Sequence, residues 1–91
     1  MNVTELTERP RLASKAVLRH DEVRDAELLL LPERVVRLSD SSAAVLRLCD
    51  GARTVGELLG RLREDFPSSD LTDDVLGFLA DARQRGWVVV G

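Results

Sequence analysis

Few side chains in this sequence could carry out catalysis or bind a metal ion, and they are not grouped. His20 is the single histidine and stands beside Asp21 and Glu22, whereas Cys49 is the single cysteine and follows Leu48. No second histidine or cysteine lies at the spacing of zinc ligands, so we interpret His20 as a solvated side chain. Cys49 has no histidine near it in the pattern to activate it, and buried cysteines usually act as small hydrophobes. The sequence therefore predicts no catalytic residue, no metal or cofactor site, and a protein that is not an enzyme.

The composition is that of one small domain without the surplus of positive charge that nucleic-acid binding requires. The chain has 91 residues, of which 44% are hydrophobic, and its aromatic residues are two phenylalanines and one tryptophan. A core of this size, built mainly from leucine and valine, leaves little room for a deep catalytic cavity. Thirteen basic and sixteen acidic residues are interspersed and give a net charge of −3. This balance argues against a nucleic-acid partner.

The cysteine count and the hydropathy indicate the cellular compartment in which the protein is expected. A single cysteine allows no internal disulfide, and the sequence has neither a secretory signal nor an apolar run long enough to span a bilayer. We therefore expect a cytoplasmic protein without a membrane partner.

The remaining candidate for a functional site is the unpaired backbone of a strand at the edge of a sheet. The apolar runs Leu28–Leu31 and Val35–Leu38 are separated by Pro32, which cannot donate a sheet hydrogen bond, and by the polar pair Glu33 and Arg34. This pattern predicts two paired strands with a reversal between them. The second strand, over residues 34–38, comes just before the helical part of the chain and can form an edge of the sheet. An extended peptide can add to the unpaired backbone groups of such an edge.

An earlier strand and a first helix flank this hairpin. The earlier strand begins near Ala16, and a turn at residues 24–26 joins it to the leucine run. The first helix covers roughly residues 40–50, with Ser39 or Asp40 as its cap and Gly51 as its stop.

Two further helices follow. The second begins with the capping box of Thr54 and Glu57 and ends at Pro67. The third begins at Asp70 or Thr72 and ends at Gly86. Its inward positions are expected to be Leu71, Val75, Phe78, Leu79 and Ala82.

The predicted fold class is α+β, in the order β-β-β-α-α-α. A three-stranded antiparallel sheet followed by a three-helix bundle is a winged-helix-like arrangement. Residues 1–13 are expected to form an N-terminal arm that is flexible unless a neighbour orders it, and residues 14–91 a single domain. The β-prone run Trp87–Val90 should turn back either onto the body of the domain or onto a second copy, so a homodimer through this run stays open.

A winged-helix shape invites comparison with DNA-binding regulators, in which the last helix enters the major groove. Here the start of that helix carries Asp70, Asp73 and Asp74, and carboxylates repel the phosphates that line the groove. Favourable interaction with the helix dipole explains these acids equally well. Either explanation argues against DNA readout and leaves a DNA-binding regulator as a distant alternative.

Peptide binding in a groove between the third strand and the third helix is the preferred reading. Leu76 stands off the apolar face of the third helix and would be exposed in such a groove together with Leu79. The alternative is that Leu76 only widens the core face of the helix.

Four stretches of the sequence together resemble the PqqD family of small proteins of pyrroloquinoline quinone biosynthesis. They are RPRL at residues 9–12, RHDEVRDAELLLLPERVVRL at 19–38, CDGARTVGELL at 49–59 and DVLGFL at 74–79. The resemblance covers about residues 9–87 in the same order. Its most specific parts are the Pro-Glu-Arg turn after the leucines and the Cys-Asp-Gly sequence after the first helix.

This resemblance implies a peptide chaperone that binds the precursor peptide PqqA and presents it to the radical S-adenosylmethionine enzyme PqqE. A related recognition element, serving another modified peptide and its enzyme, is the alternative. In this family the leader peptide adds to the third strand and packs on the third helix. Carried over by position, the peptide-binding residues would be Val35, Val36, Arg37, Leu38, Val75, Leu76, Leu79 and Arg83. Arg37 and Arg83 are expected either to meet acidic side chains of the peptide or to be plain surface arginines.

Overall fold

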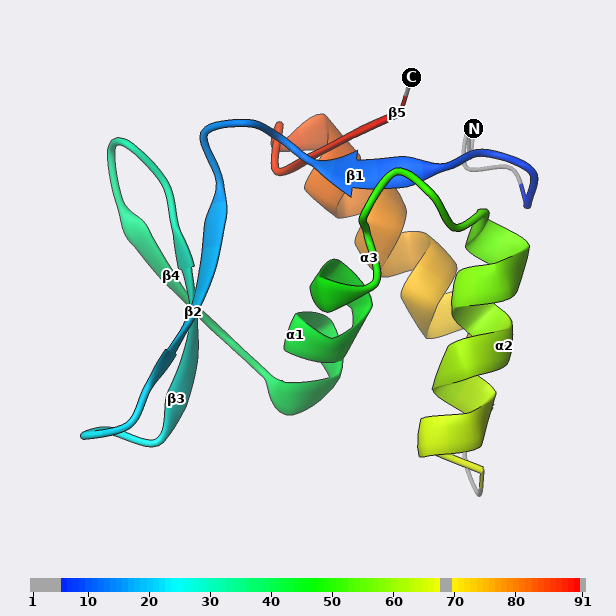
Figure 1. Cartoon of the computed structure of the whole chain (residues 1–91), viewed down its shortest axis with the longest axis horizontal. Helices are drawn as coiled ribbons and strands as arrows, with labels where there is room; N and C mark the ends of the chain where they lie inside the picture. Colours follow the sequence, from blue (N-terminus) through cyan, green and yellow to red (C-terminus); the bar gives the residue numbers. More distant parts are fainter. Residues whose placement is uncertain (1–5, 68–69, 91) are drawn as a thin grey trace.

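In the computed structural model, which describes residues 6–67 and 70–90, three consecutive strands form an antiparallel sheet (Figure 1). These strands are β2 (Val17–Asp21), β3 (Ala26–Leu30) and β4 (Val35–Leu38), and their spatial order is β2-β3-β4. The Leu31 N–H donates to the Arg34 carbonyl at 2.9 Å and closes the turn. The predicted hairpin with its reversal after the leucines is therefore confirmed, and β4 is an edge strand of this sheet.

The helices begin largely where capping rules place them. The structure has α1 at Asp40–Arg47, α2 at Val55–Asp65 and α3 at Thr72–Gln84. Ser39 caps α1, and the reciprocal capping box of Thr54 and Glu57 is present at the start of α2. The first residue before α3 is Leu71, which makes no side-chain cap. Asp70 instead accepts a hydrogen bond from the Thr72 N–H at 3.2 Å, so the start of α3 differs from the predicted cap.

The Cys-Asp-Gly sequence forms the turn that joins α1 to α2. Gly51 has a φ of 79°, which favours glycine. The Asp50 carboxylate accepts hydrogen bonds from the N–H groups of Ala52 and Arg53 at 2.9 and 3.1 Å. These backbone hydrogen bonds lower the pKa of Asp50. The motif is therefore a turn whose side chain satisfies the backbone, as in other Asx turns.

A second, two-stranded sheet joins the two ends of the described chain. Its strands are β1 (Pro10–Leu12) and β5 (Val88–Val90), which pair antiparallel with each other. The run Trp87–Val90 thus turns back onto the body of the domain, the first of its two expected alternatives. It also orders residues 10–12 of the N-terminal arm, in which no strand was predicted. Residues 1–5 of that arm lie outside the described residues.

The N-terminal segment also satisfies the first turn of α2. The N–H groups of Val55 and Gly56 donate to the carbonyls of Glu8 and Leu6 at 2.8 and 2.9 Å. These N–H groups have no partner within a helix, so an outside acceptor stabilises the helix start. The second sheet was absent from the predicted order, which makes the winged-helix comparison a loose analogy, while the α+β class is confirmed.

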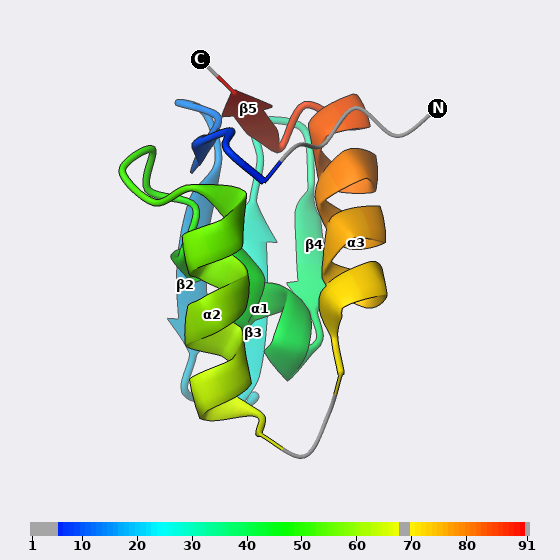
Figure 2. The same ribbon diagram turned by 90° about the vertical axis from the view of Figure 1, so that its right-hand side faces the viewer.

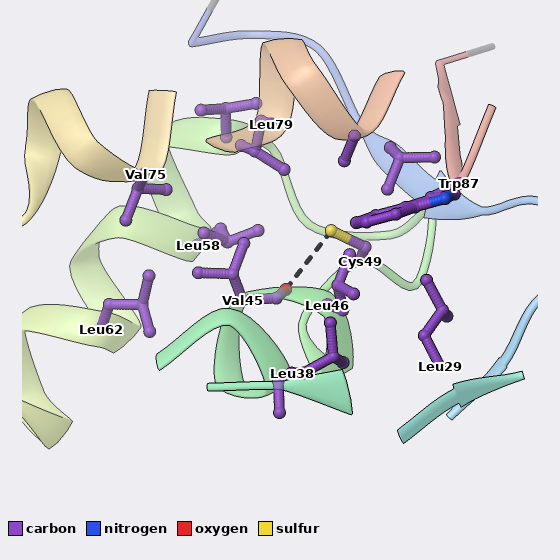
Figure 3. Close-up of a cluster of buried hydrophobic side chains, with 14 of the residues drawn as sticks. Leu29, Leu38, Val45, Leu46, Cys49, Leu58, Leu62, Val75, Leu79 and Trp87 are labelled. Carbon is purple, nitrogen blue, oxygen red and sulfur yellow. Dashed lines mark hydrogen bonds between the residues drawn. The ribbon is translucent and has the colours of Figure 1, made fainter. Parts of the chain in front are cut away.

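The core lies between the larger sheet and the helices, all of which cover one face of that sheet (Figure 1). It is built from leucine and valine, as predicted, and Trp87 closes it beside β5. Figure 3 shows these side chains converging from the sheet and from all three helices. The largest fully buried side chains are Leu29, Leu46, Leu58, Leu62, Val55 and Val88.

The capping box makes α2 sensitive to substitution and to acid. Replacing Thr54 by alanine is expected to lower the free energy of unfolding by about 1 kcal/mol, because one N–H of the first turn loses its acceptor. Hydrogen bonds from Thr54 hold the pKa of Glu57 below its ordinary value. The stabilisation that Glu57 provides is therefore present above that ordinary pKa and is lost as the pH falls through the folded-state pKa.

Urea unfolding measured from pH 7 to pH 3 checks both effects. Glu57→Gln is the matched control, because glutamine keeps the capping hydrogen bond but does not titrate. The unsubstituted chain should lose more stability on acidification than Glu57→Gln does. Equal losses would show that Glu57 contributes nothing to the acid sensitivity.

Candidate functional site

The outer edge of β4 presents backbone groups that its neighbour does not use. Leu31 and Arg34 are a hydrogen-bonded pair, and antiparallel pairing alternates hydrogen-bonded with non-hydrogen-bonded pairs. In the observed register, Val36 is therefore bonded to β3, whereas the N–H and C=O groups of Val35 and Arg37 point away from it. None of the backbone hydrogen bonds found outside regular elements in residues 6–67 and 70–90 involves Val35 or Arg37. These groups are the ones that an added strand would bind.

The side chains of β4 alternate between the two faces of the sheet. Val36 lies opposite the fully buried Leu29. Val36 is itself partly buried and packs against the core, and Leu38 is only 9% exposed. Val35 is 60% exposed and Arg37 is exposed, both on the face away from the helices. Of the four predicted strand residues, Val36 and Leu38 thus face the helices, and Val35 and Arg37 offer the free backbone edge.

A hollow of about 260 Å³ lies where β4 leads into α1. Figure 2 shows β4 and α3 toward one side of the molecule, with β2 and α2 toward the other. The hollow is walled by the start of α1, by α2 and by the first half of α3. Its lining residues are Ser41, Ser42, Val45, Leu62, Leu71, Asp74, Val75 and Phe78. A mainly apolar hollow with polar groups at its rim can hold a bulky apolar side chain.

A second hollow, of about 300 Å³, lies beside the turn that precedes β4. Its residues come from the loop after β1, from the turn between β3 and β4, and from the end of α3. They are Ala13, Ser14, Lys15, Ala16, Leu31, Pro32, Glu33, Arg85, Gly86 and Trp87. The Arg85 guanidinium lies 5.4 Å from the centre of the Trp87 ring and also pairs with Asp81. One hollow thus includes the turn that precedes β4, and the other includes the start of α1, the helix that follows β4 in the chain.

The predicted peptide-binding residues of α3 lie on two different sides of the helix. Thr72 meets Arg63 of α2, and Arg83 meets Glu8 of the N-terminal segment. Leu76 lies one helical turn after Thr72 and two turns before Arg83, so it shares this side of α3. Leu76 and Arg83 are therefore turned toward α2 and the N-terminal segment. Their predicted contact with the peptide would require it to reach this side, and stays a prediction.

Phe78 is the residue that the sequence prediction left out of the site. It was assigned to the core because it follows the apolar spacing of α3, yet it is only partly buried and lines the 260 Å³ hollow with Val75. Leu79 is 2% exposed and belongs to the core. The signal in the sequence was that Phe78 follows the apolar spacing of α3. That spacing does not distinguish a side chain in the core from a side chain that lines a groove.

The ionisable groups near these surfaces are arranged as structural contacts. His20 Nδ1 lies 2.9 Å from Glu27 Oε1, and Arg47 of α1 lies 2.8 Å from the other oxygen of that carboxylate. Burial opposes ionisation of Glu27, but the hydrogen bonds from Arg47 and His20 prevail and lower its pKa. This cluster joins the sheet to α1. His20 is exposed, as expected for a solvated side chain, and it is also paired with Glu27.

Cys49 lies in the core rather than at a reactive site. Its Sγ donates to the Val45 carbonyl at 3.3 Å (Figure 3). Burial, with the nearby charge of Asp50, raises the pKa of the thiol to about 12. Such a thiol is almost entirely protonated at neutral pH and is a poor nucleophile.

No group of three or more histidine, cysteine or acidic residues that could hold a metal ion occurs within residues 6–67 and 70–90. In the same part of the chain, no helix combines the length and hydrophobicity that crossing a membrane requires.

Comparisons with known proteins agree with this geometry. The family described as Coenzyme PQQ synthesis protein D (PqqD) matches residues 27–88. Proteins named PqqA binding protein from Azotobacter vinelandii and Pseudomonas aeruginosa are 39% and 34% identical to the chain over 89 residues, with 97% of both chains covered in each case.

A solved structure extends the match to three dimensions. It is the solution NMR structure of the PqqD truncation of Methylobacterium extorquens PqqCD, described as a functional and stand-alone recognition element for ribosomally synthesised and post-translationally modified peptides. Its TM-score is 0.79 at 34% identity, covering 97% of this chain and 96% of that one. The resemblance seen in the sequence is thereby confirmed, and the chain belongs to the PqqD family.

Proposed function

We propose that this chain is a non-catalytic peptide chaperone of pyrroloquinoline quinone biosynthesis. It binds the precursor peptide PqqA by strand addition to β4 and presents it to the radical S-adenosylmethionine enzyme PqqE. The observation that carries this proposal is the free edge of β4, together with the hollow between α1 and α3. Its support from relatives is the name PqqA binding protein in Azotobacter and Pseudomonas.

Strand addition would sort the peptide side chains into two sets. Successive residues of a strand point to opposite faces. One set would lie over Val36 and Leu38 and reach the hollow beside Phe78, so apolar residues are favoured there. The other set would lie beside Val35 and Arg37, where the exposed guanidinium favours a carboxylate. Backbone hydrogen bonds would supply affinity, and these alternate contacts would supply selectivity.

Amide chemical shifts of the isotope-labelled chain, followed during titration with PqqA, test the proposal. Saturable shifts are expected at Val35 and Arg37 and around Phe78, and a scrambled PqqA should give none. Saturable shifts confined to other elements would refute the site. Saturation by a different precursor peptide, with no response to PqqA at roughly tens of micromolar, would refute the PqqA assignment and point to another modified peptide.

A matched pair of variants on α3 tests which side of the helix the peptide meets. Phe78→Ala is expected to weaken peptide binding about tenfold or more, the effect of losing an aromatic contact at the centre of an interface. Leu76→Ala, an apolar truncation on the other side of α3, is expected to change the Kd less than about twofold. Isothermal titration calorimetry measures both. Equal losses, or a larger loss for Leu76→Ala, would move the groove to the side facing α2.

A further inference from the structure

No helix or strand within residues 6–67 and 70–90 covers the face of the larger sheet that points away from the helices (Figure 1). In the observed register, Leu30 lies between Val17 on one neighbouring strand and Val35 on the other. Val17 is 54% exposed and Val35 is 60% exposed, while Leu30 is half-buried. Single exposed valines are ordinary, but a contiguous apolar row across three strands is typical of interaction surfaces.

The adjacent row on this face is basic at both ends. Leu28 lies between Arg19 of β2 and Arg37 of β4. Both arginines are exposed, and neither takes part in an ion pair or side-chain hydrogen bond found within residues 6–67 and 70–90. Arginine beside apolar side chains is enriched in protein interfaces, where it pairs with carboxylates.

The two rows border a shallow hollow of about 520 Å³. Its lining residues are Arg19, His20, Asp21, Glu22, Arg24, Leu28, Leu30 and Val35. Of the two acidic residues in this lining, Asp21 forms an ion pair with Arg24 at 3.1 Å, and Glu22 is the other. The surface is therefore apolar at its centre, with two uncommitted guanidinium groups at its rim.

We propose that this open face, formed by Val17, Arg19, Leu28, Leu30, Val35 and Arg37, docks the enzyme that modifies the bound peptide. The enzyme surface that fits it is apolar and carries a carboxylate opposite Arg19, the guanidinium that the peptide does not meet. The inference rests on the proposed function, since it takes a peptide-modifying enzyme as the partner. It adds the surface used and the chemistry of the matching surface.

Strand addition explains why this face suits presentation of the peptide. A peptide paired with β4 becomes the fourth strand of the sheet, and every second side chain then extends the rows of the open face past Val35 and Arg37. An enzyme seated on the open face would touch the domain and the peptide together. Enzyme and peptide should then each raise the affinity of the domain for the other, as linkage requires.

Charge reversal on β2 tests the open face without touching the peptide edge, because β2 is the strand farthest from that edge. Arg19→Glu is expected to weaken binding of purified PqqE about tenfold or more, since a guanidinium facing a carboxylate is replaced by a like charge. Arg61→Glu, the same charge change on the exposed side of α2, is the control and should change PqqE affinity less than about threefold. Val17→Ser is a second, uncharged probe of the apolar row and should also weaken PqqE binding.

Affinity for PqqE is measured by surface plasmon resonance with and without PqqA, and affinity for PqqA by calorimetry. Arg19→Glu should leave the PqqA affinity unchanged. Equal effects of Arg19→Glu and Arg61→Glu on the affinity for PqqE would overturn the proposal that the open face docks the enzyme. A homodimer that is seen in sedimentation and dissociated by Arg19→Glu would also overturn it. If the unsubstituted chain failed to bind PqqA, the proposed function would fall. A selective loss of PqqE binding in Arg19→Glu would still support the open face.

Discussion

Arg37→Pro is expected to abolish most peptide binding while the domain stays folded. The Arg37 N–H points away from β3 in the observed register, so its loss removes no bond of the existing sheet. The proline ring would instead occupy the space in which a peptide carbonyl must approach. Losing that hydrogen bond and crowding its neighbour should cost about 2 kcal/mol, or roughly thirtyfold in Kd.

Two further variants make this result specific to the backbone edge. Arg37→Ala removes the side chain but keeps the N–H, so it should weaken peptide binding much less than Arg37→Pro. Val36→Pro removes an N–H that bonds to β3 and should destabilise the sheet itself. Peptide affinity by calorimetry and unfolding by circular dichroism separate these effects. Equal Kd values for Arg37→Pro and Arg37→Ala would exclude strand addition at β4.

Leu46→Ala is expected to have the largest effect on stability. Leu46 is fully buried on α1 (Figure 3), and α1 contacts α2 and every strand of the larger sheet. Truncation of a buried leucine to alanine removes apolar contacts and leaves a cavity, which costs roughly 3–5 kcal/mol. The total stability of a small domain is about 5–15 kcal/mol, so this variant should lose a large part of it.

Urea unfolding at pH 7 measures the loss. Val23→Ala is the control, because Val23 is 96% exposed in the turn between β2 and β3 and should change stability by less than about 0.5 kcal/mol. Peptide binding should also weaken in Leu46→Ala, since α1 supplies Ser41, Ser42 and Val45 to the hollow. A loss of stability similar to that of Val23→Ala would mean that α1 is not central to the core.

Local rules were sufficient to predict much of the fold. The hairpin around Pro32, the cap at Ser39 and the capping box of Thr54 and Glu57 each depend on residues within a few positions of one another. Apolar periodicity then identified the buried sides of the helices. Strand β1 was missed because Pro10–Leu12 is too short to show a periodicity, and it becomes a strand only by pairing with Val88–Val90 at the far end of the described chain.

The sequence by itself determined the three strands of the larger sheet with β4 at its edge, the three helices, the apolar core and the family resemblance. Only the tertiary structure decided which flank of α3 faces which neighbour. Leu76 and Phe78 are both apolar and flank the same buried stripe of Val75 and Leu79. The apolar spacing predicted Phe78 for the core and Leu76 for the groove, but it does not show which neighbour each side of the helix meets. Their roles separate only because α2 and the N-terminal segment pack against one flank, while α1 leaves a hollow beside the other. The position of a groove depends on how whole elements pack, and residue spacing within one helix does not contain that information.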